Sequence, residues 1–90
     1  MDEGRKKRNV IRDSEGLLAL ANQLKLVRKR HGYTQERLAS EAGLELSQIA
    51  RIETAKTNPT VSTMMRIART LDIPVNHLFE FKLEKGDYTK

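Results

Sequence analysis

The stretch Thr34–Glu53 reads TQERLASEAGLELSQIARIE and contains two short helical patterns separated by a tight turn. Thr34 predicts the start of the first helix, because its hydroxyl can accept hydrogen bonds from backbone N–H groups two or three residues later. Gly43 predicts its end, because glycine readily adopts the positive φ that closes a helix C-terminus. Three apolar residues between them share one narrow stripe that faces the core: Leu38, Ala39 and Ala42.

A second helix is predicted to begin near Leu46. Its apolar residues Ile49 and Ile52 share one face. Polar residues occupy the other face: Ser47, Gln48 and Arg51. Two short helices joined by a three- or four-residue turn with a glycine form the helix-turn-helix layout, in which the second helix lies in the major groove of DNA.

Upstream of this stretch, Asp13 or Ser14 can cap a helix that should run to about Arg30. Four residues at three- and four-residue steps predict one buried stripe on it: Leu17, Leu20, Leu24 and Val27. Leu18 and Leu26 fall outside this stripe and indicate a second apolar surface.

Downstream, Thr60 can cap a fourth helix, and Pro74 starts a short fifth one. The residues of these two helices that we expect in the core are Met64, Met65, Ile67, Ala68, Leu71, Val75, Leu78 and Phe79. The sequence therefore predicts an all-α fold.

Composition narrows the function classes. Ninety residues form one domain, and the absence of cysteine excludes disulfides and thiolate metal sites. With only two histidines, far apart in the sequence, we expect no metal and no cofactor. No run reaches the roughly 18 apolar residues of a membrane span, so we expect no membrane contact and a cytoplasmic location. A net charge of +5 favours an anionic partner such as nucleic acid.

The chain resembles the Cro/C1-type (XRE) helix-turn-helix family of phage repressors and small bacterial regulators. The residues that carry this resemblance are Arg28, Gly32, Tyr33, Thr34, Gln35, Leu38, Ala39, Gly43, Leu44, Ile49, Ile52, Glu53, Lys56, Asn58, Pro59, Ile67, Ala68, Leu71, Leu78 and Phe79. The resemblance covers roughly residues 20–81 and implies a compact five-helix, lambda-repressor-like DNA-binding domain.

We divide the chain into a basic flexible N-terminal arm at 1–12, the helix-turn-helix domain at 13–81 and a polar C-terminal tail at 82–90. The arm carries the block Arg5–Arg8, which either meets phosphates or a minor groove, or belongs to a solvated tail.

The resemblance implies a structural ion pair between Arg28 and Glu53; the alternative is two solvated surface charges. It also implies phosphate contacts at the start of the second helix and in the loop after the third: Thr34, Gln35, Arg37, Lys56, Thr57 and Asn58. Arg37 stands where the family commonly has Glu, so it removes the capping-box partner of Thr34 and adds a positive charge.

Base reading is expected from the exposed face of the third helix: Leu46, Ser47, Gln48, Arg51 and Thr54. Arg51 can donate two hydrogen bonds to the O6/N7 edge of guanine, and Gln48 can read adenine or meet a phosphate. Leu46 departs from the polar residue common in relatives, and an apolar side chain there can touch a thymine methyl. Ala55 stands where the family often has Gly; either it adopts positive φ, at a cost of about 1 kcal/mol, or the helix ends differently.

The expected function is a sequence-specific transcriptional regulator, a repressor that binds double-stranded DNA as a homodimer on a palindromic operator. The dimer surface in related proteins is often at the fifth helix or in terminal extensions, which here indicates Phe79 and Phe81, with Leu18 or Leu26 as further candidates. The alternative is a protein-interaction module or antitoxin whose main ligand is a protein, and a regulatory protein partner would suit either function. We find no catalytic residue set and expect no enzyme.

Overall fold

The computed structural model describes residues 11–89. Across these residues the elements are α1 (Ser14–Arg30), α2 (Gln35–Ala42), α3 (Leu46–Glu53), α4 (Val61–Leu71) and the 3-10 helix η2 (Val75–Phe79). The all-α prediction is confirmed. The predicted fifth α-helix is a 3-10 helix instead, since five residues after a proline suit the short, tighter form. Residues 1–10 of the predicted arm and residue 90 of the predicted tail lie outside the described residues.

Side chains cap the start of each α-helix. The carboxylate of Asp13 accepts a hydrogen bond from the backbone N–H of Gly16 at 2.9 Å. The hydroxyls of Thr34 and Thr60 likewise accept from backbone N–H groups three residues later, at 3.0 and 3.1 Å. These three caps start α1, α2 and α4 where the sequence predicts. At α3 the Oε1 atom of Gln48 accepts from the backbone N–H of Glu45 at 2.8 Å.

Each α-helix is followed by a residue in the left-handed region: Gly32, Gly43, Ala55 and Asp72. After α3, the N–H of Ala55 donates to the carbonyl of Ile52 at 3.2 Å, and the N–H of Lys56 donates to the carbonyl of Arg51 at 2.9 Å. This pair of bonds is the Schellman motif, which satisfies the last carbonyls of a helix. Ala55 has φ +58°. Of the two alternatives given for this position, the structure therefore adopts the strained one, with positive φ.

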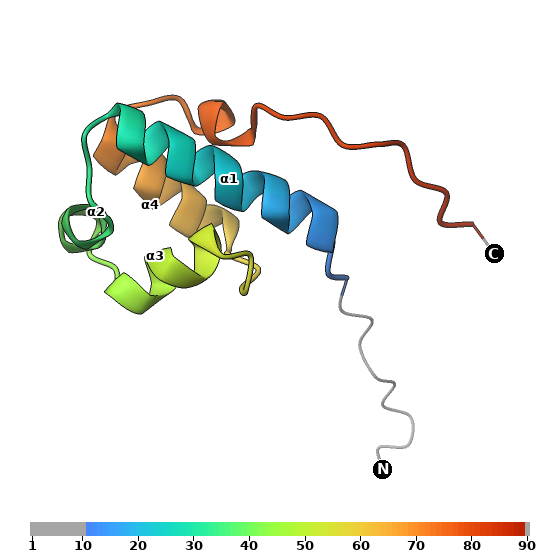
Figure 1. Ribbon diagram of the computed structural model, residues 1–90, viewed down its shortest axis with the longest axis horizontal. Coiled ribbons are helices and arrows are strands. Elements are labelled where there is room, and N and C mark those ends of the chain that lie inside the picture. Colours follow the sequence, from blue (N-terminus) through green and yellow to red (C-terminus); the bar gives the residue numbers. More distant parts are fainter. Residues whose placement is uncertain (1–10, 90) are drawn as a thin grey trace, which may run out of the picture.

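The core lies where α1, α3, α4 and η2 meet, and α2 closes it beside α3 and α4 (Figure 1). The buried residues at its centre are Leu24, Val27, Leu38, Ile49, Ile67 and Leu78. Gln23 on α1 ties η2 to this core, because its side-chain amide donates to the carbonyl of His77 at 2.8 Å. In Figure 1, α3 and η2 lie on opposite sides of α1.

Three residues predicted to be buried are exposed instead: Met65 (45%), Val75 (38%) and Phe79 (44%). Met65 follows the buried Met64 by one residue, a step of about 100° that turns its side chain away from the stripe. Leu78 is the buried residue of η2. Phe79 follows it by one residue, a step of about 120° in a helix with three residues per turn, which turns its ring away from the core. This period does not explain the exposure of Val75, which stands three residues before Leu78.

We predict that Ala55→Gly raises the free energy of unfolding by about 1 kcal/mol, because glycine relieves the strain of the left-handed conformation. Urea denaturation followed by circular dichroism measures this change. The matched control is Ala19→Gly inside α1, which should lower the free energy of unfolding by about 0.5–1 kcal/mol. A stability loss at both positions would show that Ala55 is not strained.

Candidate nucleic-acid interface

The orientation of α3 depends on a buried ion pair between Arg28 at the end of α1 and Glu53 at the end of α3. Nε of Arg28 lies 2.6 Å from Oε2 of Glu53, and Nη2 lies 2.9 Å from Oε1. The two residues are 7% and 2% exposed. This bidentate geometry is the strong form of an Arg–carboxylate contact. The structure therefore contains the pair, buried rather than solvated.

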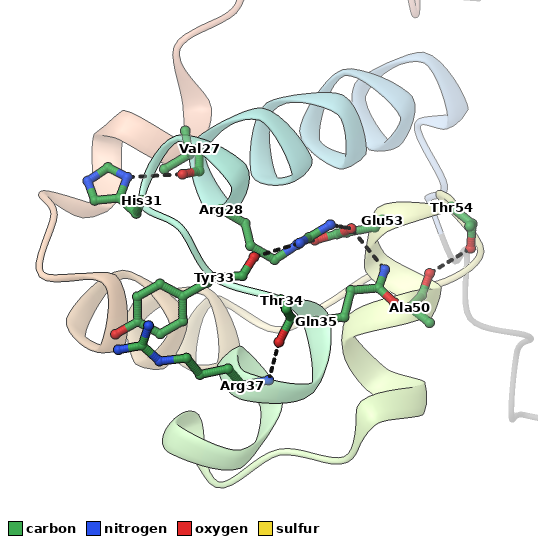
Figure 2. Close-up of polar contacts among 10 residues, drawn as sticks. All are labelled: Val27, Arg28, His31, Tyr33, Thr34, Gln35, Arg37, Ala50, Glu53 and Thr54. Atoms are coloured by element: carbon green, nitrogen blue, oxygen red, sulfur yellow. Dashed lines mark hydrogen bonds and ion pairs between the residues drawn. The ribbon is translucent and has the colours of Figure 1, made fainter.

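Two further hydrogen bonds complete this network (Figure 2). Nη1 of Arg28 donates to the carbonyl of Tyr33 at 2.8 Å, and the side-chain amide of Gln35 donates to Oε1 of Glu53 at 2.9 Å. The hydrogen bond with Glu53 raises the pKa of Arg28, so the guanidinium stays charged. We call Arg28, Tyr33, Gln35 and Glu53 the brace, because together they connect α1, the following loop and the start of α2 to the end of α3.

All five predicted base-reading residues, namely Leu46, Ser47, Gln48, Arg51 and Thr54, are exposed. Two of them also serve the helix itself. Gln48 uses its Oε1 atom to cap the start of α3, and the Thr54 hydroxyl donates to the carbonyl of Ala50 at 2.8 Å. Because its oxygen is already engaged, Gln48 offers DNA chiefly its amide N–H donors.

The start of α2 presents backbone N–H groups beside Thr34. The Thr34 hydroxyl accepts from the N–H of Arg37, while the Gln35 side chain is half-buried and turned toward Glu53. The first N–H groups of a helix have no partner within the helix, so they can meet an anion. Of the predicted phosphate contacts here, Gln35 is a brace residue: one of its two side-chain N–H groups donates to Glu53, and the other N–H and the backbone N–H remain as candidates.

Arg37 has partners within the chain that the sequence analysis did not anticipate. Its guanidinium lies 4.0 Å from the centre of the Tyr33 ring, and its Nε is 2.9 Å from a carboxylate oxygen of Glu41. The Tyr33 hydroxyl donates to the same carboxylate at 2.9 Å. The hydrogen bonds from Arg37 and Tyr33 lower the pKa of Glu41. These contacts weaken the prediction that Arg37 meets a phosphate; the four-residue spacing to Glu41 was the available signal.

The loop after α3 contains the other predicted phosphate contacts, Lys56, Thr57 and Asn58. Lys56 and Asn58 are exposed, and Thr57 is half-buried. A polar cleft of about 190 Å³ separates this loop and the start of α4 from Gln48 and Arg51. The guanidinium of Arg12 also reaches this loop, since its Nη2 donates to the carbonyl of Ala55 at 2.7 Å. This contact spans 43 positions along the chain, and no sequence pattern predicted it.

An apolar groove of about 410 Å³ lies between the start of α1, the start of α4 and η2 with the segment that follows it. Its apolar lining includes Leu17, Leu20, Met64, Phe79, Phe81 and Leu83. Leu18 and Leu26 are 54% and 44% exposed, as expected for residues outside the buried stripe, but they do not line this groove. The residues suggested for a dimer surface therefore belong to two separate places.

Comparison with known proteins agrees with this geometry. A family model described as Helix-turn-helix matches residues 24–78. Antitoxin HipB of Escherichia coli (strain K12) is 37% identical over 54 residues, which cover 60% of this chain and 61% of that protein. The HTH-type transcriptional regulator SinR of Bacillus subtilis (strain 168) is 32% identical over 66 residues, covering 72% of this chain and 60% of SinR.

Among solved structures, the restriction-modification controller protein C.AhdI from Aeromonas hydrophila superposes with a TM-score of 0.68 at 30% identity, covering 70% of this chain and 96% of that one. The chain spans only about 60% of the length of HipB and SinR. Within residues 11–89, no helix has the length and apolar character needed to cross a bilayer.

We predict that Glu53→Gln lowers the free energy of unfolding by about 3–5 kcal/mol, because it leaves the Arg28 charge buried without a counter-charge. Urea denaturation measures the loss. The matched control is Glu41→Gln, which breaks an exposed Arg–carboxylate pair on the same domain and should leave stability almost unchanged. Equal effects of the two substitutions would contradict the role of the brace.

Proposed function

The chain belongs to the Cro/C1-type (XRE) helix-turn-helix family, and from this membership and the site we propose that it is a sequence-specific, double-stranded DNA-binding transcriptional regulator. The main support for this proposal is the brace. Its buried ion pair, with 2.6 Å between Nε of Arg28 and Oε2 of Glu53, fixes α3, while the opposite face of α3 stays exposed. A rigid helix with exposed polar side chains is what the major groove accepts.

We assign base reading to the outward residues of α3 and positioning to groups near its C-terminal end. Arg51 is the candidate for guanine, because its guanidinium can donate two hydrogen bonds to one base edge. The backbone N–H groups at the start of α2 and the Lys56 ammonium are the candidates for phosphates on either side of the groove. Arg12 places the beginning of the described chain beside the loop that carries Lys56, because its guanidinium donates to the carbonyl of Ala55.

We propose that the protein acts as a homodimer. One α3 of eight residues reads only a few base pairs, too few to identify one site in a genome. Two-fold dimers solve this problem by reading two half-sites about one helical turn apart. Phe79 and Phe81 are the candidates for the dimer surface, because both line the apolar groove and their rings are 6.3 Å apart.

A second candidate function is an antitoxin or interaction module whose main ligand is a protein. The similarity to the relative named as an antitoxin favours it. One face of the protein can bind DNA while another binds a toxin, so an antitoxin function is compatible with DNA-binding regulation. The proposal includes repression as the direction of regulation. It also includes a cytoplasmic location, because a regulator of this kind acts where the chromosome lies.

The proposal is tested by titrating a labelled pool of random duplexes with the purified protein at several salt concentrations. We expect enrichment of a palindrome with half-sites about one turn apart, and an affinity that falls steeply as salt rises. Weak binding without an enriched sequence would reject the proposal and direct attention to capture of a protein partner.

We predict that Arg51→Ala and Lys56→Ala weaken DNA binding in different ways. Arg51→Ala should remove discrimination at one base pair of each half-site, worth about 1–3 kcal/mol. Lys56→Ala should weaken all sequences alike and reduce the slope of log K against log salt by about 1 for each protomer. Binding of the selected site and of its single-base variants measures both effects. If Lys56→Ala changed discrimination at one base pair and Arg51→Ala weakened all sequences alike, Lys56 would be the base reader and Arg51 the phosphate contact.

A further inference from the structure

The exposed face of α3 has an apolar edge and a polar edge. Leu46, the first residue of α3, is 43% exposed, and Ala50 follows one turn later on the same side. Gln48 and Arg51 line the polar cleft toward α4. Leu46 lines neither this cleft nor the apolar groove, and it does not belong to the buried core.

Hydrogen bonds hold both ends of the helix that carries Leu46. The residue before it, Glu45, donates its backbone N–H to Gln48 at 2.8 Å, which fastens the first turn of α3. The brace fastens the last turn. An exposed leucine alone is ordinary. This one stands in the first turn of the reading helix, where side chains meet base edges.

We propose that Leu46 reads the C5-methyl group of a pyrimidine in each half-site. The proposal rests on the proposed function and names one of its specificity-determining contacts. The C5-methyl group is the apolar group that a base edge presents in the major groove. The other groups on the base edges there are hydrogen-bond donors and acceptors. Thymine and 5-methylcytosine both carry it.

Neighbouring side chains do not make this contact equally well. Ser47 and Arg51 present polar groups that lose hydrogen bonds to water if they are placed against a methyl group. Leu46 has nothing polar to desolvate, so its contact adds apolar burial at no such cost. The transfer of one methyl group out of water corresponds to about a fourfold change in Kd for each half-site, and roughly 16-fold for two half-sites.

The experiment uses the operator obtained from the selection on random duplexes. In one arm each thymine of the half-site is replaced in turn by uracil, symmetrically in both halves, which removes only the methyl group. In the other arm each cytosine is replaced by 5-methylcytosine, which only adds one. Kd is measured for the wild type, for Leu46→Ala and for the control Met65→Ala, whose side chain is 45% exposed on α4.

We expect one position at which the methyl group strengthens binding by the wild type and by Met65→Ala, and at which Leu46→Ala binds both duplexes equally. An effect in the uracil arm identifies thymine as the base, and an effect in the cytosine arm identifies 5-methylcytosine.

A specific operator without any Leu46-dependent methyl effect would overturn this proposal and leave the proposed function standing. A methyl effect that persists in Leu46→Ala would also overturn it, because another side chain would then be the reader. Failure to enrich any sequence would reject the proposed function together with this inference.

Discussion

The position of α3 depends on the buried contact between Arg28 and Glu53. Isolated helices as short as α2 and α3, with eight residues each, are marginal in water, so their stability must come from contacts with the rest of the chain. A carboxylate at the C-terminal end of α3 is disfavoured by the helix dipole, and the guanidinium of Arg28 compensates for it. Arg28 is itself well placed, since it lies in the last turn of α1. The Tyr33 carbonyl accepts from the third nitrogen of Arg28, and Gln35 donates to Glu53. Among the described residues no buried side-chain nitrogen or oxygen is then without a partner, as buried polar groups require.

The sequence predicted those parts of the fold that are set by neighbours along the chain. The hydroxyls of Thr34 and Thr60 and the apolar stripe of α1 act within a few residues, and the structure has each of them where expected. The outward face of α3 followed from its period, because the buried Ile49 and Ile52 fix which side remains for solvent. The pairing of Arg28 with Glu53 was different, since it came from the family resemblance and not from spacing.

Most of the features that the sequence did not predict are of two kinds. Some depend on residues far apart in the chain, and others depend on a backbone conformation that the residue type alone does not determine. The contacts of Arg37 with the Tyr33 ring and the Glu41 carboxylate are an exception, because both partners are four positions away; its phosphate contact stays a prediction. Arg12 bonds to the carbonyl of Ala55, a contact that no local pattern reveals. Ala55 itself shows the second kind of difficulty: an alanine after a helix is compatible with several helix ends, and only the structure shows that it adopts φ +58°.

The way in which α3 is fastened separates its reading face from the stability of the domain. Its last turn is held by Glu53 and its first turn by the bond between Gln48 and Glu45, while Ile49 and Ile52 face the core. Of the exposed positions, Leu46, Ser47 and Arg51 contribute to none of these contacts. Substitutions there should cost little folding stability, because exposed helix positions away from such features have small effects on it. If these residues read bases as proposed, such substitutions change the DNA sequence that is favoured without unfolding the domain. An exposed, apolar Leu46 is therefore compatible with an intact fold, and under the proposed function its consequence falls on the DNA sequence that is read.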